Sequence, residues 1–406
     1  MKSVDRLAAM IALPSVTGAE GEVIARIDGW LRAIGGDVES HVARMTELER
    51  DPEYPGREVE REDVPFVCAT LEGARPGPHV VLTGHVDVVP PGDPAAWSAD
   101  PFEPRVDGDR LFGRGAADMK GGIVSLLAVY EAFAASDFAG TLTFLAVPGE
   151  EDGGTGTLAA IRHGLRPDFV IIPEPTAGDD DVPQAVVAHA GAIVYRLTFE
   201  GRPAHAAFRR EGESALSGFE VVHRALEIAE RRINETETDA LMRALDLPYP
   251  TNVGVVRGGD WASTVMESLV AEIRVGVALG ESIEEADARV RETIATAAAE
   301  AGGWLAGHPP RVQRSGGVYR SARTPSDDAL VAALRGASAE VYGAPASLAA
   351  MPYGCDMGQW RHLTGASVVV YGPGRARVAH TIDEWVSLDA VMQTARVLER
   401  TVRRLR

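Results

Sequence analysis

Cysteine is scarce in this 406-residue chain, which contains only Cys68 and Cys355. Two cysteines cannot build the disulfide framework of a small secreted protein, so we expect two reduced thiols. Long apolar runs are also missing, because none approaches the roughly 20 residues that a membrane-spanning helix needs. The stretch Leu7–Leu13 follows basic residues as in a signal peptide, but Asp5 interrupts the basic region. These features favour a cytoplasmic protein with no membrane partner.

Positive charge is scarce as well. The chain has 40 Lys and Arg against 59 Asp and Glu, a formal net charge of −19. Such a balance repels nucleic acids and anionic membrane surfaces, so we expect no nucleic-acid partner. Hydrophobic residues make up 45% of the chain and charged residues 24%, which is enough for a substantial core. The length favours two or three compact units at about 150 residues each.

Hydrophobic periodicity predicts an α/β fold for much of the chain. Helices are expected at Ser3–Leu13, Glu20–Ile34 and Gly121–Ala135. The β-branched runs that predict strands are Phe66–Leu71, Val80–Thr83, Thr141–Val147 and Phe169–Ile172. This alternation is typical of a mixed, mostly parallel sheet between helices. The charge-dense segment Arg44–Asp63 shows no periodicity, and we expect it to be a solvated loop or insertion.

The pattern changes near Ile193 to a β-α-β-β-α-β order, which predicts a smaller, ferredoxin-like α+β domain. Its expected elements are a strand to Glu200, a helix over Ser214–Arg231, strands over Thr251–Val256 and Leu269–Val277, a helix over Ile283–Ala301 and a strand near Arg311. After Thr324 the α/β pattern resumes, with a helix over Asp327–Val341 and a strand over Ala366–Tyr371. The simplest architecture is one domain formed by residues 1–191 and 314–406, interrupted by a second domain at 192–313.

Acids and histidines follow the predicted strands at their carboxyl ends. They are His85 and Asp87 after one strand, Glu150 and Glu151 after the next, Glu174 after the third and His380 after the last. Open α/β sheets place ligand sites at this edge. Together with Asp118, from a glycine-rich loop, these side chains form a nitrogen and oxygen ligand set that suits two zinc, cobalt or manganese ions.

Each of these features has a simpler interpretation when it is taken alone. His85 and Asp87 are also typical of a local hydrogen-bonded pair, and Glu150 with Glu151 is typical of an exposed acidic turn. The loop around Asp118 resembles a phosphate-binding loop, but its glycine spacing does not fit, and Lys120 is followed by Gly. The convergence of all of them on one sheet edge is what favours the metal site.

These residues fall in motifs that span nearly the whole chain. In order they are Pro14-Ser15-Val16-Thr17-Gly18-Ala19-Glu20, Gly84-His85-Val86-Asp87-Val88-Val89-Pro90, Gly113-Arg114-Gly115, Asp118-Met119-Lys120-Gly121-Gly122, Glu150-Glu151, Glu174-Pro175-Thr176, Gly201 through His205-Ala206, Gly372-Pro373-Gly374 and Ala379-His380-Thr381-Ile382-Asp383-Glu384. This set resembles the co-catalytic zinc hydrolases that include acetylornithine deacetylase, succinyl-diaminopimelate desuccinylase, aminoacylase and carboxypeptidase G.

The resemblance implies a role for each residue of the set. His85 and Glu174 would bind one zinc ion, Glu151 and His380 the other, and Asp118 would bridge the two. Glu150 would be the general base and acid. Asp87 would orient His85.

The resemblance also implies that the inserted domain is a lid through which a homodimer forms. His205 would reach the partner subunit's site and stabilise the oxyanion. Asn252 and Arg274 would contact the substrate, Arg274 through the substrate's carboxylate. Gly354 falls where the family has a substrate loop, although the local sequence departs from the common forms. His189 and His362 match no motif and are interpreted as structural.

The predicted activity is hydrolysis of the amide bond in an N-acyl amino acid or a related small N-acylated amine by a water molecule that two metal ions activate. The alternative within the same family is a dipeptidase or carboxypeptidase, which a panel of substrates would separate from a deacylase. A remote alternative is a non-catalytic metal-binding relative. Such a relative should lack the base or a ligand, whereas Glu150 and all five ligand positions are present.

Overall fold

The computed structural model describes residues 2–178 and 181–405, which divide into two compact units. Unit 1 comprises the described residues within Met1–Val187, Arg323–Ala349 and Cys355–Arg406. Unit 2 comprises Ala188–Ala322 and Ala350–Gly354. Within the described ranges, no helix combines the length and the apolar character needed to cross a membrane.

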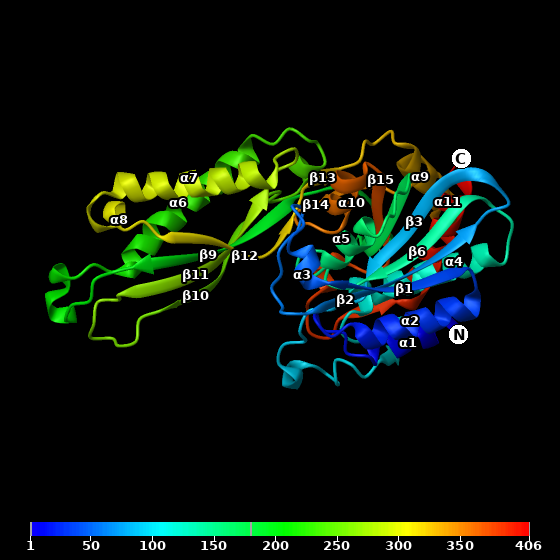
Figure 1. Ribbon diagram of the computed structural model, residues 1–406, viewed down its shortest axis with the longest axis horizontal. Coiled ribbons are helices and arrows are strands. Elements are labelled where there is room, and N and C mark those ends of the chain that lie inside the picture. Colours follow the sequence, from blue (N-terminus) through cyan, green and yellow to red (C-terminus); the bar gives the residue numbers. More distant parts are fainter. Residues whose placement is uncertain (1, 179–180, 406) are drawn as a thin grey trace. The chain divides into compact units, whose positions relative to one another are not determined.

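Unit 1 is built on a large mixed sheet (Figure 1). Among the described residues its strands run in the order β1-β2-β6-β3-β7-β15-β8-β13, with β14 beside β8. Their bounds are β1 Asp37–Arg44, β2 Asp63–Glu72, β3 Arg75–His85, β6 Ala139–Val147, β7 Phe169–Pro175, β8 Ala185–His189, β13 Ala322–Arg323, β14 Leu348–Met351 and β15 Ser367–Gly372. The central strands β6, β3, β7 and β15 are parallel, whereas β1, β2 and β6 pair antiparallel. This confirms a mixed sheet with parallel strands between helices, although antiparallel pairs at β1, β2 and β8 make it less parallel than predicted.

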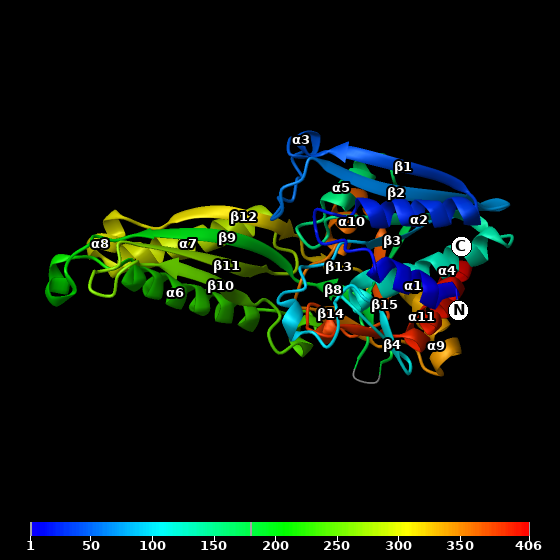
Figure 2. The same cartoon turned by 90° about the horizontal axis from the view of Figure 1, so that it is seen from below.

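Helices cover both faces of this sheet, which is why its central strands are apolar on both sides. On β3, the consecutive residues Val80, Val81 and Leu82 are all buried. One face carries α1 Lys2–Ile11, α2 Gly21–Ile34, α4 Gly121–Ala134, α9 Ala329–Tyr342 and α11 Leu388–Arg404, and the other carries α5 Thr155–Arg162 and α10 Met357–Thr364 (Figures 1 and 2). A small sheet of β16 Trp385–Ser387, β5 Arg110–Phe112 and β4 Arg105–Asp107 completes the unit.

Unit 2 has the predicted β-α-β-β-α-β order. Its strands β9 Gly191–Glu200, β10 Thr251–Gly258, β11 Ser268–Val277 and β12 Arg311–Tyr319 pair antiparallel in the order β10-β11-β9-β12. Helices α6 Ala215–Glu235 and α7 Ile283–Ala301 pack together on this sheet, and the short helix α8 Gly303–Gly307 follows. The core comes from alternate residues of the two central strands, such as Tyr195 and Leu197 on β9. Ser282 and Glu285 form a capping box that starts α7.

The structure contradicts one prediction about unit 1. The segment Arg44–Asp63 is not a solvated loop, because it contains α3 Met45–Leu48, whose two terminal residues are buried. The Arg61 side chain in this segment is only 3% exposed. The prediction was wrong because it treated a high density of charge as evidence for solvent contact. Here an arginine of the segment pairs with buried acids instead.

Candidate metal centre

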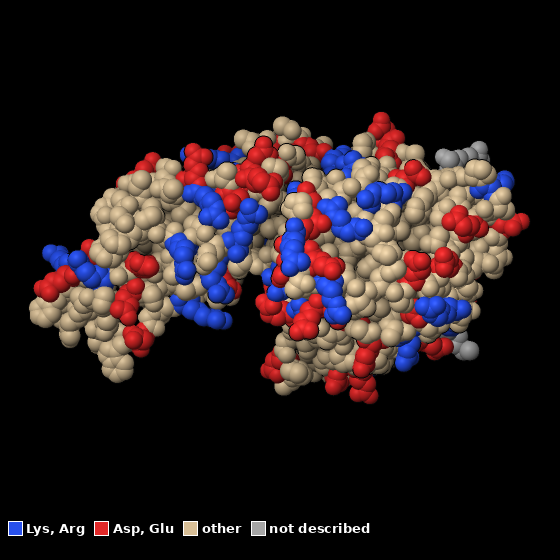
Figure 3. Space-filling view, in the orientation of Figure 1, with Lys and Arg blue, Asp and Glu red and all other residues tan. Residues whose placement is uncertain are grey.

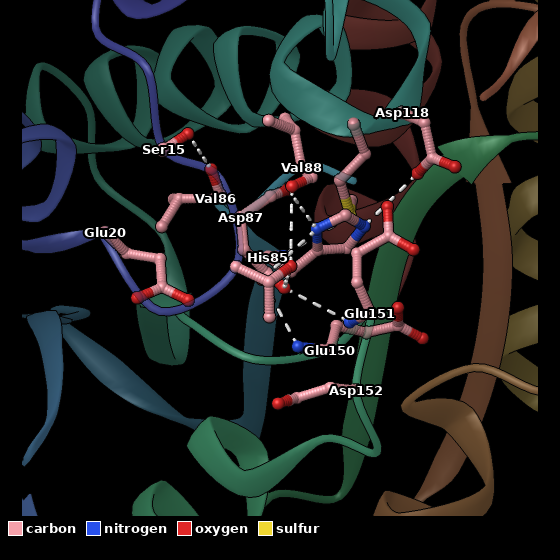
Figure 4. A network of polar contacts seen from close by, with 12 residues as sticks. Ser15, Glu20, His85, Val86, Asp87, Val88, Asp118, Glu150, Glu151 and Asp152 are labelled. Carbon is pink, nitrogen blue, oxygen red and sulfur yellow. Dashed lines mark hydrogen bonds and ion pairs between the residues drawn. The ribbon is translucent and has the colours of Figure 1, made fainter. Parts of the chain in front are cut away.

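His85 occupies the last position of β3, where the chain leaves the sheet, and it is 1% exposed. Its Nδ1 lies 2.9 Å from the backbone carbonyl oxygen of Asp87, and a carbonyl oxygen can only accept. Nδ1 is therefore the donor, and Nε2 faces two carboxylates, 3.2 Å from Asp118 Oδ1 and 3.4 Å from Glu174 Oε1. Figure 4 shows the imidazole between Asp87 and Asp118. This is the tautomer that a metal-binding histidine needs.

Asp118 lies between two histidines. Its Oδ1 faces His85, while its Oδ2 lies 3.3 Å from Nε2 of His380. His380 Nε2 is also 3.1 Å from Glu151 Oε1. The two oxygens of one carboxylate thus face two imidazoles that lie 295 residues apart in sequence, 380 − 85. A carboxylate with this placement is able to bridge two cations.

Glu384 fixes the loop that carries Asp118. Its carboxylate accepts hydrogen bonds from the backbone N–H groups of Gly115, Ala117 and Asp118 at 2.9–3.0 Å. Arg114 donates to the same carboxylate at 2.7 Å, and both side chains are buried. This buried ion pair therefore ties the glycine-rich loop to the segment that follows His380. The sequence reasoning quoted both residues in motifs but gave neither of them a role.

Asp87 connects His85 to the loop of the two glutamates. Its side chain is fully buried and accepts the backbone N–H groups of Glu150 and Glu151, each at 3.2 Å (Figure 4). Thr17 Oγ1 donates to it at 3.2 Å. The Asp87 carboxylate is 3.5 Å from Nδ1 of His85, so the hydrogen bond that orients the ring goes to the Asp87 carbonyl. The sequence suggested the carboxylate for that contact.

A second buried network supports the same loop from the other side. Arg61 donates to Asp152 at 2.9 Å and to Glu20 at 3.2 Å, and all three side chains are at most 3% exposed. Glu20 also accepts the backbone N–H of Gly18 at 2.8 Å. Asp152 directly follows Glu150 and Glu151, so its contact with Arg61 fixes the position of the chain next to these two residues. Sequence reasoning missed this residue because its partners are distant in the chain.

The site concentrates negative charge, and the histidines respond to it. Hydrogen bonds to Asp118 and Glu151 raise the pKa of His380 to about 10. Burial alone would lower the pKa of His85, but the charge of Glu174 and the hydrogen bond to Asp118 raise it well above its usual value. For Asp118, burial alone would raise the pKa, but hydrogen bonds to His380 and His85 hold this pKa far below its usual range. Both histidines therefore bind a proton more tightly than a free imidazole does, because acidic side chains surround them.

Four carboxyl groups around the site have raised pKa values. Burial is the largest cause for Glu150, whose pKa lies well above its usual value, and for Glu174, whose pKa is about 8. Burial and the neighbouring charge of Asp118 raise the pKa of Glu151. Asp356, directly before α10, is buried as well, and burial raises its pKa to about 6. Its carboxylate accepts a hydrogen bond from Thr157 Oγ1 at 2.6 Å. A carboxyl group with a raised pKa is suited to carrying a proton near neutral pH.

Four predicted site residues belong to unit 2. His205 precedes a 3₁₀ turn at Ala206–Glu211, is exposed, and accepts from the N–H of Ala207 at 3.1 Å. Asn252 on β10 and Arg274 on β11 are paired in register, and burial lowers the pKa of Arg274. Gly354 packs so closely that an added Cβ would lie 2.3 Å from Cβ of Tyr319. The structure brings Asn252 and Arg274 together within this unit.

The two histidines interpreted as structural have contacts of their own. His189, in β8, is fully buried, and its Nδ1 lies 2.9 Å from the carbonyl oxygen of Ala190. His362, in α10, pairs with Glu53 at 3.3 Å on the surface.

Comparison with known proteins assigns a family to this architecture. A model described as peptidase family M20/M25/M40 matches residues 81–404. The chain belongs to peptidase family M20/M25/M40. This membership indicates a hydrolase that acts on amide bonds, and it agrees with the resemblance carried by the motifs.

The proteins that this chain resembles are named for several activities. A succinyl-diaminopimelate desuccinylase from Methylobacterium sp. (strain 4-46) is 39% identical over 218 residues, 52% of this chain and 51% of that protein. The chain therefore spans about half the length of the curated relatives it matches. An M20 family metallo-carboxypeptidase from Sulfolobus solfataricus has a TM-score of 0.77 at 15% identity, covering 99% of both chains. A dinuclear metal-binding M20 peptidase from Bacillus subtilis has a TM-score of 0.65 at 14% identity, covering 99% of this chain and 96% of that one. At these identities the two solved structures support the fold.

The donor atoms of this M20 chain fit the metal ions on which the family depends. Atoms of His85, Glu150 and Glu174 lie within 4.8 Å of one another, as do atoms of His85, Asp118 and Glu151. Both groups consist of imidazole nitrogens and carboxylate oxygens, which bind zinc, cobalt and manganese. Both groups contain His85, whose Nε2 is its one nitrogen left to bind an ion, so the two groups overlap.

Proposed function

We propose that the chain is a deacylase that hydrolyses the amide bond of an N-acyl amino acid or a related small N-acylated amine. The proposal is carried by one observation, the Asp118 carboxylate that faces His85 through one oxygen and His380 through the other. That arrangement supports a two-cation site, with His85 and Glu174 on one cation, Glu151 and His380 on the other, and Asp118 between them. Zinc is the first candidate, and cobalt and manganese fit the same donors.

The bound cations would polarise the amide carbonyl and lower the pKa of water between them from about 15.7 to about 7. The protein's own side chains would do the rest. Glu150, buried beside His85 and Glu174, accepts the proton of the attacking water and delivers it to the leaving nitrogen. Burial raises the pKa of Glu150 well above its usual value, so this carboxyl group holds a proton more readily than an ordinary glutamate does. Asp87 holds Glu150 and Glu151 by their backbone N–H groups.

Residues of unit 2 would complete the site as the resemblance implies. His205 stabilises the oxyanion, from the partner subunit of a homodimer that forms through the lid. Asn252 and Arg274 bind the substrate, Arg274 by pairing with its carboxylate, and Gly354 lies in the substrate loop. Exposed apolar side chains support a contact surface on this unit, among them Phe208 at 61% and Trp261 at 72% exposed. Light scattering of the wild type and of a Trp261→Glu variant would test the homodimer.

The partner expected for the active site is a small amide, and we retain a cytoplasmic location as part of the proposal. Figure 3 shows basic and acidic side chains on the visible face of both units, with several basic side chains of unit 2 grouped together.

The test combines metal analysis with a substrate panel. The protein, purified without chelator, is analysed for metal and then assayed for amine release from N-acetyl, N-succinyl, N-formyl and N-carbamoyl amino acids and from dipeptides. N-succinyl substrates come first, because the desuccinylase relatives carry that activity in their names. Turnover of an N-acyl amino acid with about two bound metal ions supports the proposal. Turnover of dipeptides alone would favour the dipeptidase or carboxypeptidase, and bound metal without turnover of any substrate would favour a non-catalytic relative.

A further inference from the structure

Three further side chains with metal-binding atoms lie on the first two strands of the large sheet, and a fourth lies next to them at the end of α5. Glu39 and His41 lie two residues apart on β1, so both point to the same face. Cys68 on the neighbouring strand β2 is paired in register with Glu39, and His41 is paired with Phe66. His163 directly follows α5, the helix that packs on this face of β2 (Figure 2). In the sheet order β1-β2-β6-β3, these strands lie two and three positions away from β3, which carries His85.

The ligand atoms of Glu39, His41 and Cys68 are close enough to share one ion. Atoms of Glu39, His41 and Cys68 all lie within 4.8 Å of one another. Glu39 Oε2 is 3.2 Å from Nε2 of His41 and 3.9 Å from Nε2 of His163. Zinc bonds of about 2.0–2.3 Å in a tetrahedron place neighbouring ligand atoms roughly 3.3–3.8 Å apart. The two spacings from Glu39 lie close to this range, and the Cys68 and His163 side chains would move to complete the tetrahedron.

The chemistry of the set is also that of a zinc site. One thiolate, one carboxylate and two neutral imidazoles carry a formal charge of −2, which a divalent cation would neutralise. The Glu39 and His163 side chains are 53% and 47% exposed, so an ion in solution can reach them, whereas Cys68 is 7% exposed. The exposed Glu39 and His163 side chains would let an ion reach the site from solvent. Four protein atoms, including the buried thiolate of Cys68, would then bind it.

Aromatic packing is the competing explanation for the two histidines. The ring centroids of His41 and His163 are 3.7 Å apart, and Phe66 lies 5.0 Å from the first ring and 6.0 Å from the second. Packing explains why the rings stack on one another. It does not explain why the Nε2 atoms of both rings approach the same carboxylate oxygen next to a thiol.

We propose that Glu39, His41, Cys68 and His163 form a structural site for one divalent transition-metal ion of the zinc type, separate from the candidate metal centre. Binding removes the thiol proton of Cys68, which passes to solvent, and joins β1, β2 and the end of α5 through one ion. This proposal does not depend on the proposed catalysis, because it involves no residue of that centre.

Cobalt substitution tests the proposal on the full-length protein. The metal-free protein is titrated with Co²⁺, and a thiolate ligand produces a strong near-ultraviolet charge-transfer absorption that nitrogen and oxygen ligands do not. We expect this band with the wild type, its loss in Cys68→Ser, and its retention in the matched control Cys355→Ser. The bound stoichiometry should fall by one ion in Cys68→Ser. Absence of the band from the wild type, or its loss in Cys355→Ser instead, would overturn the proposal.

Two variants of partly exposed residues keep the test decisive if Cys68→Ser does not fold. His41→Gln and His163→Gln should each weaken the Co²⁺ species that carries the thiolate band by at least about tenfold, while thermal unfolding of the metal-free protein changes little. An unchanged affinity in His41→Gln would exclude the site. An unchanged affinity in His163→Gln would exclude the four-ligand assignment.

Discussion

The guanidinium of Arg61 lies 2.9 Å from the carboxylate of Asp152, and the two side chains are only 3% and 2% exposed. The pair joins a segment that looks solvated in the sequence to the residue directly after Glu150 and Glu151. Because Glu20 shares the same arginine, loss of Arg61 would leave two buried acids without their cation. The loop that carries Glu150 and Glu151 therefore contacts, through Asp152, a residue 89 positions before Glu150, 150 − 61.

We expect Arg61→Met to destabilise the protein by about 3–5 kcal/mol, the usual cost of removing one partner from a buried ion pair. Urea unfolding with both proteins in the metal-free state measures the difference. Arg57→Met is the matched control from the same segment, because Arg57 pairs with Glu60, which is 89% exposed. That control should cost at most about 1 kcal/mol. Equal losses in the two variants would show that Arg61 does not act through its buried pairs.

Glu150 and Glu151 are adjacent, yet we predict different losses on substitution. Glu150→Gln should lower kcat by about 10²–10⁴, because it removes the group that carries the proton, while metal binding remains. Glu151→Gln should weaken the binding of one of the two metal ions, because Glu151 faces His380. Steady-state kinetics together with metal analysis of both variants separates the two roles. Wild-type turnover by Glu150→Gln would remove it from the mechanism.

Asp87→Asn should weaken metal binding by about 10- to 100-fold, the usual effect of losing a carboxylate that supports metal ligands. The substitution removes the charge that lies 3.5 Å from Nδ1 of His85 and replaces one of the two oxygens that accept the Glu150 and Glu151 N–H groups. Competition with a fluorescent chelator measures the affinity. Thr17→Val, which deletes one hydroxyl donor to the same carboxylate, should have a clearly smaller effect. If the two variants behave alike, the charge of Asp87 is not what matters.

His189 should make the protein sensitive to acid. Burial lowers its pKa to about 4, from 6.5 in the unfolded chain, so between these values the unfolded state binds the additional proton. Stability is therefore fully present above about pH 6.5 and falls as the pH approaches 4, by up to about 3 kcal/mol from this residue. His189→Asn, which does not titrate, should show a correspondingly shallower loss in urea unfolding from pH 7.5 to 4.5. A slope equal to that of the wild type would contradict this assignment.

Much of the candidate centre could be predicted because most of its residues, although not Asp118, lie at the end of a strand with a clear signal. His85, Glu151 and Glu174 come directly after buried β-branched runs, and parallel strands bring their carboxyl ends to one edge. The order of elements in unit 2 could be predicted for a similar reason, because its strands alternate between buried and exposed residues, as β11 does.

The residues that support the centre could not be predicted from the sequence, because each of them acts through a contact with a residue far away in the chain. Glu384 accepts three backbone N–H groups from the Asp118 loop, and Arg61 reaches Asp152 across 91 residues. In the sequence both are ordinary charged residues, and single-sequence patterns assign charge to the surface. Strand β1 was also missed, because its residues are mostly exposed or half-buried and lack apolar alternation. Its pairing with β2 creates the cluster at Cys68.

The central claim is that Asp118 bridges two cations, and anomalous X-ray scattering from crystals of the zinc-loaded protein tests it most directly. We predict two anomalous peaks, one between His85, Asp118 and Glu174 and the other between Asp118, Glu151 and His380. No peak at these residues, or a single peak that does not touch Asp118 in fully zinc-loaded crystals, would contradict the account.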